Sequence, residues 1–342
     1  MNLVETKEFG KLPDGTLVHS YQLENKMGMK ITFLSYSAVM QSFILPGSEY
    51  MDIVLGFDNL EDYLTSMNME NPPYFGTMVG RFAGRIREGS FVLNQQLFQL
   101  TQNHGDHHLH GGKDSFSRAI WTVEPQTSTQ QLTFHHVSPA GADGYPGELH
   151  SKLTYRLTDD GQLIMDFKAT STEDTIINVT QHHYWNLAGH HSSVESQEIR
   201  LNATHYLDKN KDQIPTGNFV LFDEKPFQSE LTAELRENLD HTFVISDNQQ
   251  IQATLTHPTN GWKMQVKSNQ AAAHLFIGCA LPTNLLGKSG NRYHAKSGVC
   301  FEMQNFPDAP NQEHFPSCIL RKGATYENTT IFHFENQAYV KK

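Results

Sequence analysis

The chain has little cysteine, no long hydrophobic run and a deficit of basic residues. Its three cysteines, Cys279, Cys300 and Cys318, are odd in number and far apart, which disfavours a disulfide framework or a cysteine-rich zinc site and fits a reducing compartment. No stretch approaches the roughly 18 apolar residues of a membrane span. The first ten residues include Glu5 and Glu8 and have no apolar core, so they do not look like a signal peptide. We therefore expect a cytoplasmic protein.

The charge balance narrows the possible partners. The 342 residues include 26 Lys and Arg against 37 Asp and Glu, a formal net charge of −11. An acidic chain binds nucleic acid and anionic membranes poorly, so we predict neither as a partner. An uncharged small-molecule substrate is compatible with this charge. Hydrophobic residues make up 38% of the chain and aromatic residues 11%, which supports a substantial core.

Strand patterns dominate the chain, and helical periodicity is scarce. Strands are predicted at 30–34, 38–45, 90–93, 97–100, 152–157, 163–169, 251–255, 263–266, 299–304 and 329–334. Asn94-Gln95 and Asp159-Asp160-Gly161 are the clearest turns between them. Short helices are predicted at 59–66 and 229–239. The pattern predicts an all-β sandwich or barrel, and because no linker or repeat interrupts it, we expect residues 1–342 to form a single domain.

Histidine is abundant, with 19 residues, and many of them cluster. Four histidines and Asp106 lie within residues 104–110, and further pairs occupy 182–183 and 190–191. Imidazole and carboxylate groups can bind zinc, but the run lacks the helical His-Glu-x-x-His spacing. Its glycines favour a tight loop close to a ligand instead. We predict no metal, and a zinc hydrolase is an alternative that a metal assay would test.

Glu302 lies in the alternating segment 299–304, which predicts a strand. Phe301 and Met303 then point to the face opposite Glu302. A carboxylate on a rigid strand, followed by a proline-containing turn, is a candidate general base. The alternative is an ordinary exposed strand glutamate.

A histidine pair stands beside aromatic residues in the segment 178–189. If this segment is extended, His182 and Tyr184 share one face, and His183 and Trp185 share the other. Such a face is typical of a sugar site, where aromatic rings stack on C–H groups and imidazole binds hydroxyls. The alternative is a hydrogen-bonded histidine of the core.

Three arginines, Arg81, Arg85 and Arg87, follow one another closely in a glycine-rich segment. Their guanidinium groups can bind hydroxyls or carboxylates. Surface charge or a structural ion pair is the alternative. The pair Asp240-His241 is a weak indication by itself.

Taken together and in this order, these segments resemble the aldose 1-epimerase family, the galactose mutarotases. The matching motifs are Gly-Arg-…-Arg-Ile at 80–86, Asn-…-Leu-His-Gly-Gly at 103–112, Asn-x-Thr-x-His-x-Tyr-Trp-Asn-Leu-x-Gly at 178–189, Pro-Thr-Gly at 215–217, Asp-His-x-Phe at 240–243 and Glu-x-Gln-x-x-Pro-Asp-Ala-x-Asn at 302–311. Residues 143–147 and 315–326 also fit the family. The resemblance covers nearly the whole chain.

The resemblance implies a large antiparallel β-sandwich with few short helices and a sugar site in a cleft on one face. It implies that Glu302 is the catalytic base and His182 the general acid. The sugar-binding residues that it implies are Arg85, His110, Asp240, Tyr184 and, where the family usually has glutamine, His274.

Several positions depart from the family pattern. Gly84 stands where many members have asparagine, and Asn238-Leu239 precedes Asp240 where the family usually has glycine and an aromatic or aliphatic residue. Residues 225–229 read Lys-Pro-Phe-Gln-Ser where the family has Thr-Pro-Phe-Asp-Phe. Because Glu302 and His182 are both present, we expect these departures to affect the preferred sugar more than the type of reaction.

The implied reaction interconverts the α and β anomers of free hexoses such as D-galactose and D-glucose. A base removes the proton of the C1 hydroxyl, an acid protonates the ring oxygen, and the ring recloses after rotation about C1–C2. Glu302 as carboxylate and His182 as imidazolium would fill these roles near neutral pH without a metal or other cofactor. The alternatives are a hexose-6-phosphate 1-epimerase and a non-catalytic sugar-binding protein of the same fold. The preferred aldose and the oligomeric state are left open.

Overall fold

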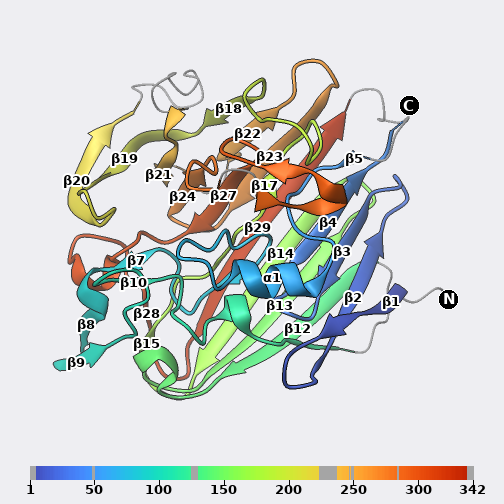
Figure 1. Cartoon of the computed structure of the whole chain (residues 1–342). Coiled ribbons are helices and arrows are strands. Elements are labelled where there is room, and N and C mark those ends of the chain that lie inside the picture. The colour runs from blue at the N-terminus through green and yellow to red at the C-terminus, as the bar shows by residue number, and fades with distance from the viewer. Residues whose placement is uncertain are drawn as a thin grey trace.

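The computed structural model describes residues 5–47, 51–124, 130–222, 237–245, 247, 250–282 and 285–336. Antiparallel sheets are the main secondary structure in this part of the chain (Figure 1). The largest sheet has eight strands, in the spatial order β11 (Thr122–Val123), β12 (Gln131–Ser138), β13 (Leu149–Leu157), β14 (Gln162–Ser171), β29 (Thr325–Asn336), β23 (Trp262–Ser268), β22 (Ala253–Thr256) and β18 (Glu198–Leu201).

Two further sheets complete the framework. The first is N-terminal and consists of β1 (Glu5–Lys11), β2 (Leu17–Glu24), β3 (Lys30–Leu34), β4 (Met40–Leu45) and β5 (Met51–Asp52). The second, which carries the candidate site, has the order β17 (Tyr184–Trp185), β27 (Val299–Gln304), β24 (Ala272–Phe276), β21 (Asp240–Ile245), β19 (Ala203–Lys209) and β20 (Pro215–Leu221).

Short elements connect and cover the sheets. Paired strands are β6 (Met78–Val79) with β16 (Thr180–Gln181), β7 (Arg85–Ile86) with β10 (His108–Leu109), β8 (Ser90–Leu93) with β9 (Gln96–Gln99), β15 (Thr175–Ile176) with β28 (Ile319–Leu320), and β25 (Leu285–Leu286) with β26 (Arg292–Tyr293). Single 3₁₀ turns occupy Arg87–Gly89, Phe116–Arg118, Ala142–Gly144, Lys288–Gly290 and Ala309–Asn311.

The first predicted helix is confirmed as α1 (Leu60–Ser66), which begins after Asn59, whose side chain accepts a hydrogen bond from the backbone of Asp62. Most of the second predicted helix, residues 229–236, lies outside the described residues. The strand predicted over 38–45 begins only at Met40, because Ser37 and Ala38 have φ values of 54° and 46° and form a turn. No helix in the described part of the chain has the length and apolarity needed to cross a bilayer.

The three sheets enclose one main core, which confirms the predicted β-sandwich. Phe33 of the N-terminal sheet stacks on Tyr155 of the eight-stranded sheet, with ring centroids 4.3 Å apart. Trp185 of the six-stranded sheet packs on Phe332 of β29 at 5.0 Å. The eight-stranded sheet is therefore one layer, and the other two sheets form the layer packed on it.

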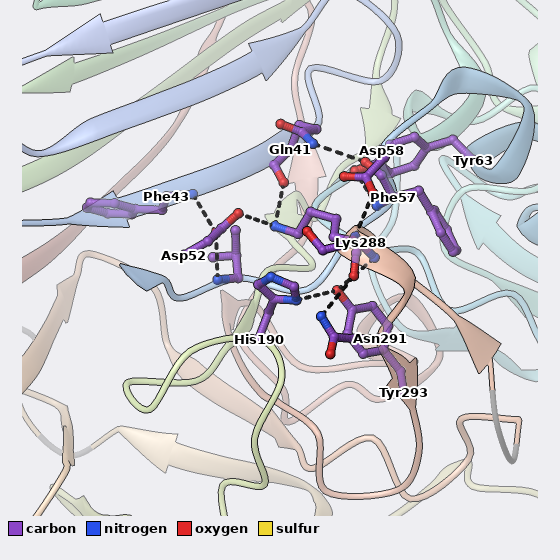
Figure 2. A network of polar contacts seen from close by, with 12 residues as sticks. Gln41, Phe43, Asp52, Phe57, Asp58, Tyr63, His190, Lys288, Asn291 and Tyr293 are labelled. Atoms are coloured by element: carbon purple, nitrogen blue, oxygen red, sulfur yellow. Dashed lines mark hydrogen bonds and ion pairs between the residues drawn. The ribbon is translucent and has the colours of Figure 1, made fainter. Parts of the chain in front are cut away.

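A buried ion pair ties the N-terminal sheet to a late loop. Figure 2 shows the Lys288 side chain extending toward Asp52 and Gln41. Its Nζ lies 2.6 Å from the Asp52 carboxylate and donates to the Gln41 carbonyl at 3.0 Å. The backbone of Lys288 also donates to the Tyr293 hydroxyl, and the Tyr293 ring packs edge-on against Phe75 at 5.5 Å. This network holds the segment around Phe75, which leads directly into the candidate pocket.

Candidate active site

Strand β27 presents Glu302 from a fully buried position. Phe301 and Met303 point into the core between the layers, whereas Glu302 and Gln304 line a pocket on the other face of the sheet. Glu302 is only 1% exposed. The predicted strand and the predicted facing of its side chains are confirmed, and the alternative of an exposed glutamate is wrong.

His182 approaches Glu302 from the link between β16 and β17. β17 pairs with β27 so that Tyr184 lies opposite Cys300, which places the preceding residue pair beside the carboxylate. His182 Nε2 lies 3.5 Å from Glu302 Oε1. On the opposite face, His183 packs against Trp185, with centroids 5.6 Å apart. The alternation predicted for this segment is therefore confirmed.

The other side of the His182 ring is enclosed. Its Nδ1 lies 3.5 Å from the Cys300 thiol, and its ring stacks on Tyr74 with centroids 5.8 Å apart. Burial and the nearby Glu302 carboxylate raise the pKa of Cys300 well above its ordinary value, so the thiol stays protonated. Nε2 is consequently the nitrogen that His182 presents toward Glu302 and the pocket.

Two neighbouring strands add an acidic and a further imidazole group. His274 of β24 lies opposite Glu302 in the ladder, and its Nε2 is 3.1 Å from Asp240 Oδ1. Its Nδ1 contacts the Thr242 hydroxyl at 2.9 Å. Burial alone would raise the pKa of Asp240, but the hydrogen bond and charge of His274, together with Lys209, lower it overall. Asp240 is thus a carboxylate held ready to accept hydrogen bonds.

The histidine-rich loop brings His110 to the pocket through a tight backbone contact. His110 has a φ of 51°, and its Nδ1 accepts a hydrogen bond from the Gly84 backbone at 3.3 Å. A Cβ atom on the next residue, Gly111, would lie 1.9 Å from the Gly80 carbonyl oxygen, so only glycine fits there. Burial lowers the pKa of His110 well below its ordinary value. The neutral ring then carries its proton on Nε2, which makes it a donor.

The three arginines of the glycine-rich segment lie in different environments. Arg85 lines the pocket, and its Nε is buried without a partner. Arg81 is 2% exposed and points away, donating to Ser138 and to four backbone carbonyls. Arg87 is exposed. Of the three, only Arg85 is placed to meet a ligand.

The pocket joins all seven residues that the sequence singled out. It is lined by Arg85, His110, His182, Tyr184, Asp240, His274 and Glu302. It is also lined by residues that the sequence did not single out, among them Tyr74, Lys209, Gln213, Thr242 and Gln304. Lys209 and Gln213 precede the Pro-Thr-Gly motif at 215–217. The local sequence there does not indicate that this segment approaches the pocket.

One departure from the family pattern has a steric reason. Gly84 has a φ of 79°, and a Cβ atom there would lie 2.9 Å from the Cβ of Pro307. A side chain at this position would push against the turn that follows Glu302. The backbone of Gly84 instead closes on His110.

No metal site accompanies the histidine clusters in the part of the chain that the structure describes. There, no three His, Cys, Asp or Glu side chains are grouped as potential ligands of one ion. His108, inside the cluster, bonds the Tyr145 hydroxyl at 2.6 Å and the Thr101 carbonyl at 2.7 Å. His108 therefore stabilises the loop by hydrogen bonding and does not line the pocket.

The β-sandwich, with a buried carboxyl and imidazole side by side in a polar pocket, is of the mutarotase type of fold. The chain belongs to the aldose 1-epimerase family, whose model matches residues 19–333. It is 35% identical over 340 residues to galactose mutarotase of Bos taurus, covering 95% of this chain and 97% of that protein. It is 30% identical to aldose 1-epimerase of Haemophilus influenzae, covering 94% and 97%.

A solved structure supports the same relationship. The crystal structure of galactose 1-epimerase from Lactobacillus acidophilus superposes with a TM-score of 0.84 at 25% identity, covering 97% of this chain and 98% of that chain. The predicted all-β fold and family are both confirmed.

Proposed function

We propose that this protein interconverts the α and β anomers of free hexoses such as D-galactose and D-glucose, with Glu302 and His182 as the proton-transfer pair. The observation that carries the proposal is the 3.5 Å approach of His182 Nε2 to Glu302 Oε1 inside a pocket. The relatives named galactose mutarotase and aldose 1-epimerase support the same reaction.

In the proposed mechanism, the Glu302 carboxylate removes the proton of the C1 hydroxyl while His182 Nε2 donates a proton to the ring oxygen. The C1–O5 bond breaks, and the open-chain aldehyde rotates about C1–C2. The reverse proton transfers then close the ring on the other face of the carbonyl. Net proton transfer is zero, so the enzyme regains its starting state without any other reactant.

Arg85, His110 and Asp240 are the proposed holders of the sugar hydroxyls, with His274 orienting Asp240 and Tyr184 forming a wall. Arg85 Nε is a donor without a partner, and Asp240 is an acceptor. Holding the sugar in one orientation keeps its C1 hydroxyl and ring oxygen aligned with the pair.

A neutral sugar fits this pocket better than a hexose 6-phosphate. Arg81 is engaged with five protein acceptors, and Arg87 does not line the pocket. Lys209 lies 3.4 Å from Asp240 Oδ2. The Asp240 carboxylate would repel a phosphate dianion.

Polarimetry tests the proposal directly. Freshly dissolved α-D-galactose and α-D-glucose should equilibrate faster with micromolar protein, and glucose 6-phosphate should respond much less. A Glu302→Gln preparation, made in parallel in the same host, controls for a contaminating mutarotase. Sugar binding without any acceleration would instead support the non-catalytic alternative.

We also propose that the chain acts in the cytoplasm as one domain. Cys279 is exposed and free, and Cys300 and Cys318 are buried and free. Free thiols of this kind are typical of reducing compartments. Fractionation of the producing cell would test the location.

A further inference from the structure

The turn between β19 and β20 brings into the pocket a polar side chain that the proposed chemistry does not use. Gln213 lines the pocket, and its Oε1 is buried without a hydrogen-bond partner. Buried polar atoms in folded proteins nearly always have a partner, so an exception that faces a ligand pocket suggests that the ligand supplies it.

The backbone of this turn holds Gln213 in one conformation. Gln213 has a φ of 64°, which residues other than glycine rarely adopt. Its backbone N–H donates to the Asn210 carbonyl at 3.0 Å, and the Asn210 side chain accepts from Asp212 at 2.9 Å and from Ile214 at 3.0 Å. Ile214 is 2% exposed and anchors the end of the turn. The carboxamide is therefore presented by a well-bonded turn.

The sheet order places this turn on the side of the pocket away from the proton-transfer pair. β24 and β21 lie between β27, which carries Glu302, and β19, which leads into the turn. With a strand spacing of about 4.8 Å, β19 lies about 14 Å from β27. Side chains from the two strands thus approach a bound sugar from opposite ends.

This separation determines which part of a hexose can meet Gln213. The proposed function places C1 and the ring oxygen at Glu302 and His182. In a pyranose ring, C4 lies across from C1 and C3 lies across from the ring oxygen, whereas C6 is attached to C5, which adjoins the ring oxygen. The hydroxyls on C3 and C4 therefore lie at the end of the sugar away from the pair, toward the β19–β20 turn.

Asp240, which also lies toward this end, has partners within the protein. Asp240 contacts His274 at 3.1 Å and Lys209 at 3.4 Å. Gln213 Oε1, by contrast, has no protein donor. A hydroxyl both donates and accepts, so it can satisfy the carboxamide in either orientation of the amide.

We propose that Gln213 is a specificity-determining residue that binds the O3 or O4 hydroxyl of the hexose. The inference rests on the proposed function and adds to it a residue that binds the end of the sugar remote from C1. Gln213 takes no part in proton transfer.

The test compares Gln213→Leu with a matched control, Gln95→Leu. Gln95 has the same φ of 64° but is exposed in the turn between β8 and β9, outside the pocket. For each protein, kcat/KM is measured by polarimetry for D-galactose, D-glucose, 3-deoxy-D-glucose and 4-deoxy-D-glucose. Loss of one neutral hydrogen bond predicts a decrease of about 3- to 10-fold for both parent sugars in Gln213→Leu only.

The deoxy sugars identify the hydroxyl and keep the test decisive. For the sugar that lacks the bound hydroxyl, wild type and Gln213→Leu should have equal kcat/KM. If Gln213→Leu folds poorly, Gln213→Ala serves equally, because the ratio between two sugars within one variant is independent of the folded fraction.

Two results would overturn the inference while leaving the proposed function intact. One is unchanged kcat/KM for all four sugars in Gln213→Leu. The other is the same decrease for all four. A wild-type protein inactive on every sugar would instead contradict the proposed function, and this inference with it.

Discussion

Glu302 and His182 lie where burial opposes a charge on either side chain. Burial raises the pKa of Glu302 well above its ordinary value and lowers the pKa of His182 to about 3. These shifts favour a protonated Glu302 and a neutral His182, not the carboxylate and imidazolium inferred from the sequence. Both states hold one proton on the pair. A bound sugar that donates to the carboxylate and accepts from the imidazole would favour the charged arrangement.

The pH dependence of kcat/KM follows from this single proton. The pair gains a second proton only at acidic pH, near the lowered pKa of His182, and loses its one proton only above the raised pKa of Glu302. We expect kcat/KM to remain high across neutral pH, without an acidic decrease near 6.5, the ordinary pKa of histidine. Polarimetric rates, corrected for the reaction in buffer alone, would reveal such a decrease if His182 titrated normally.

Removal of either proton-transfer group should reduce turnover without unfolding the protein. Glu302→Gln and His182→Asn should each lower kcat by about 10²-fold or more. Glu302→Gln should not lower the melting temperature, because a neutral amide replaces a buried carboxyl group whose Oε2 has no partner. Wild-type rates in either folded variant would move proton transfer to another residue.

At the scale of elements, the pocket depends on how the glycine-rich segment is anchored behind it. Arg81 links the glycine-rich segment, which includes the pocket residue Gly84, to Ser138 of the eight-stranded sheet. Its guanidinium donates to Ser138 and to the carbonyls of Pro139, Pro146 and Gly147. This one buried side chain holds the segment that presents Arg85 and contacts the His110 loop.

Arg81→Lys should therefore destabilise the fold, since an ammonium group cannot reproduce a planar set of donors. We expect the free energy of unfolding in urea to fall by about 2–4 kcal/mol, because several buried carbonyls lose their partner. The control is Arg87→Lys, the same substitution six residues later at an exposed position. Equal effects of the two substitutions would contradict the structural role of Arg81.

For the molecule as a whole, the sandwich brings chain segments more than 200 residues apart into one pocket, from Arg85 to Glu302. The proposed mechanism uses only the groups collected there. We expect overnight chelation to leave the rate of mutarotation unchanged, and elemental analysis to find less than stoichiometric zinc. Stoichiometric zinc together with lost activity would contradict this expectation and revive the hydrolase alternative.

The sequence by itself determined the features that depend on local geometry. The two-residue period of a strand placed Glu302 opposite Phe301 and Met303, and His182 opposite His183, and both placements are confirmed. The ordered motifs indicated the family and the seven side chains that line the pocket. These inferences needed only the alternation of strands and the order of residues along the chain.

Tertiary structure decided the features that depend on contacts between distant segments. Arg81 and Arg85 look alike in the sequence, yet one is bonded within the protein and the other faces the pocket. Gln213 lines the same pocket as Glu302 only because β19, which leads into its turn, belongs to the same sheet as β27. The preferred protonation of Glu302 and His182 is likewise a property of the assembled pocket, because a pKa shift arises from the burial and the neighbouring charges that folding creates.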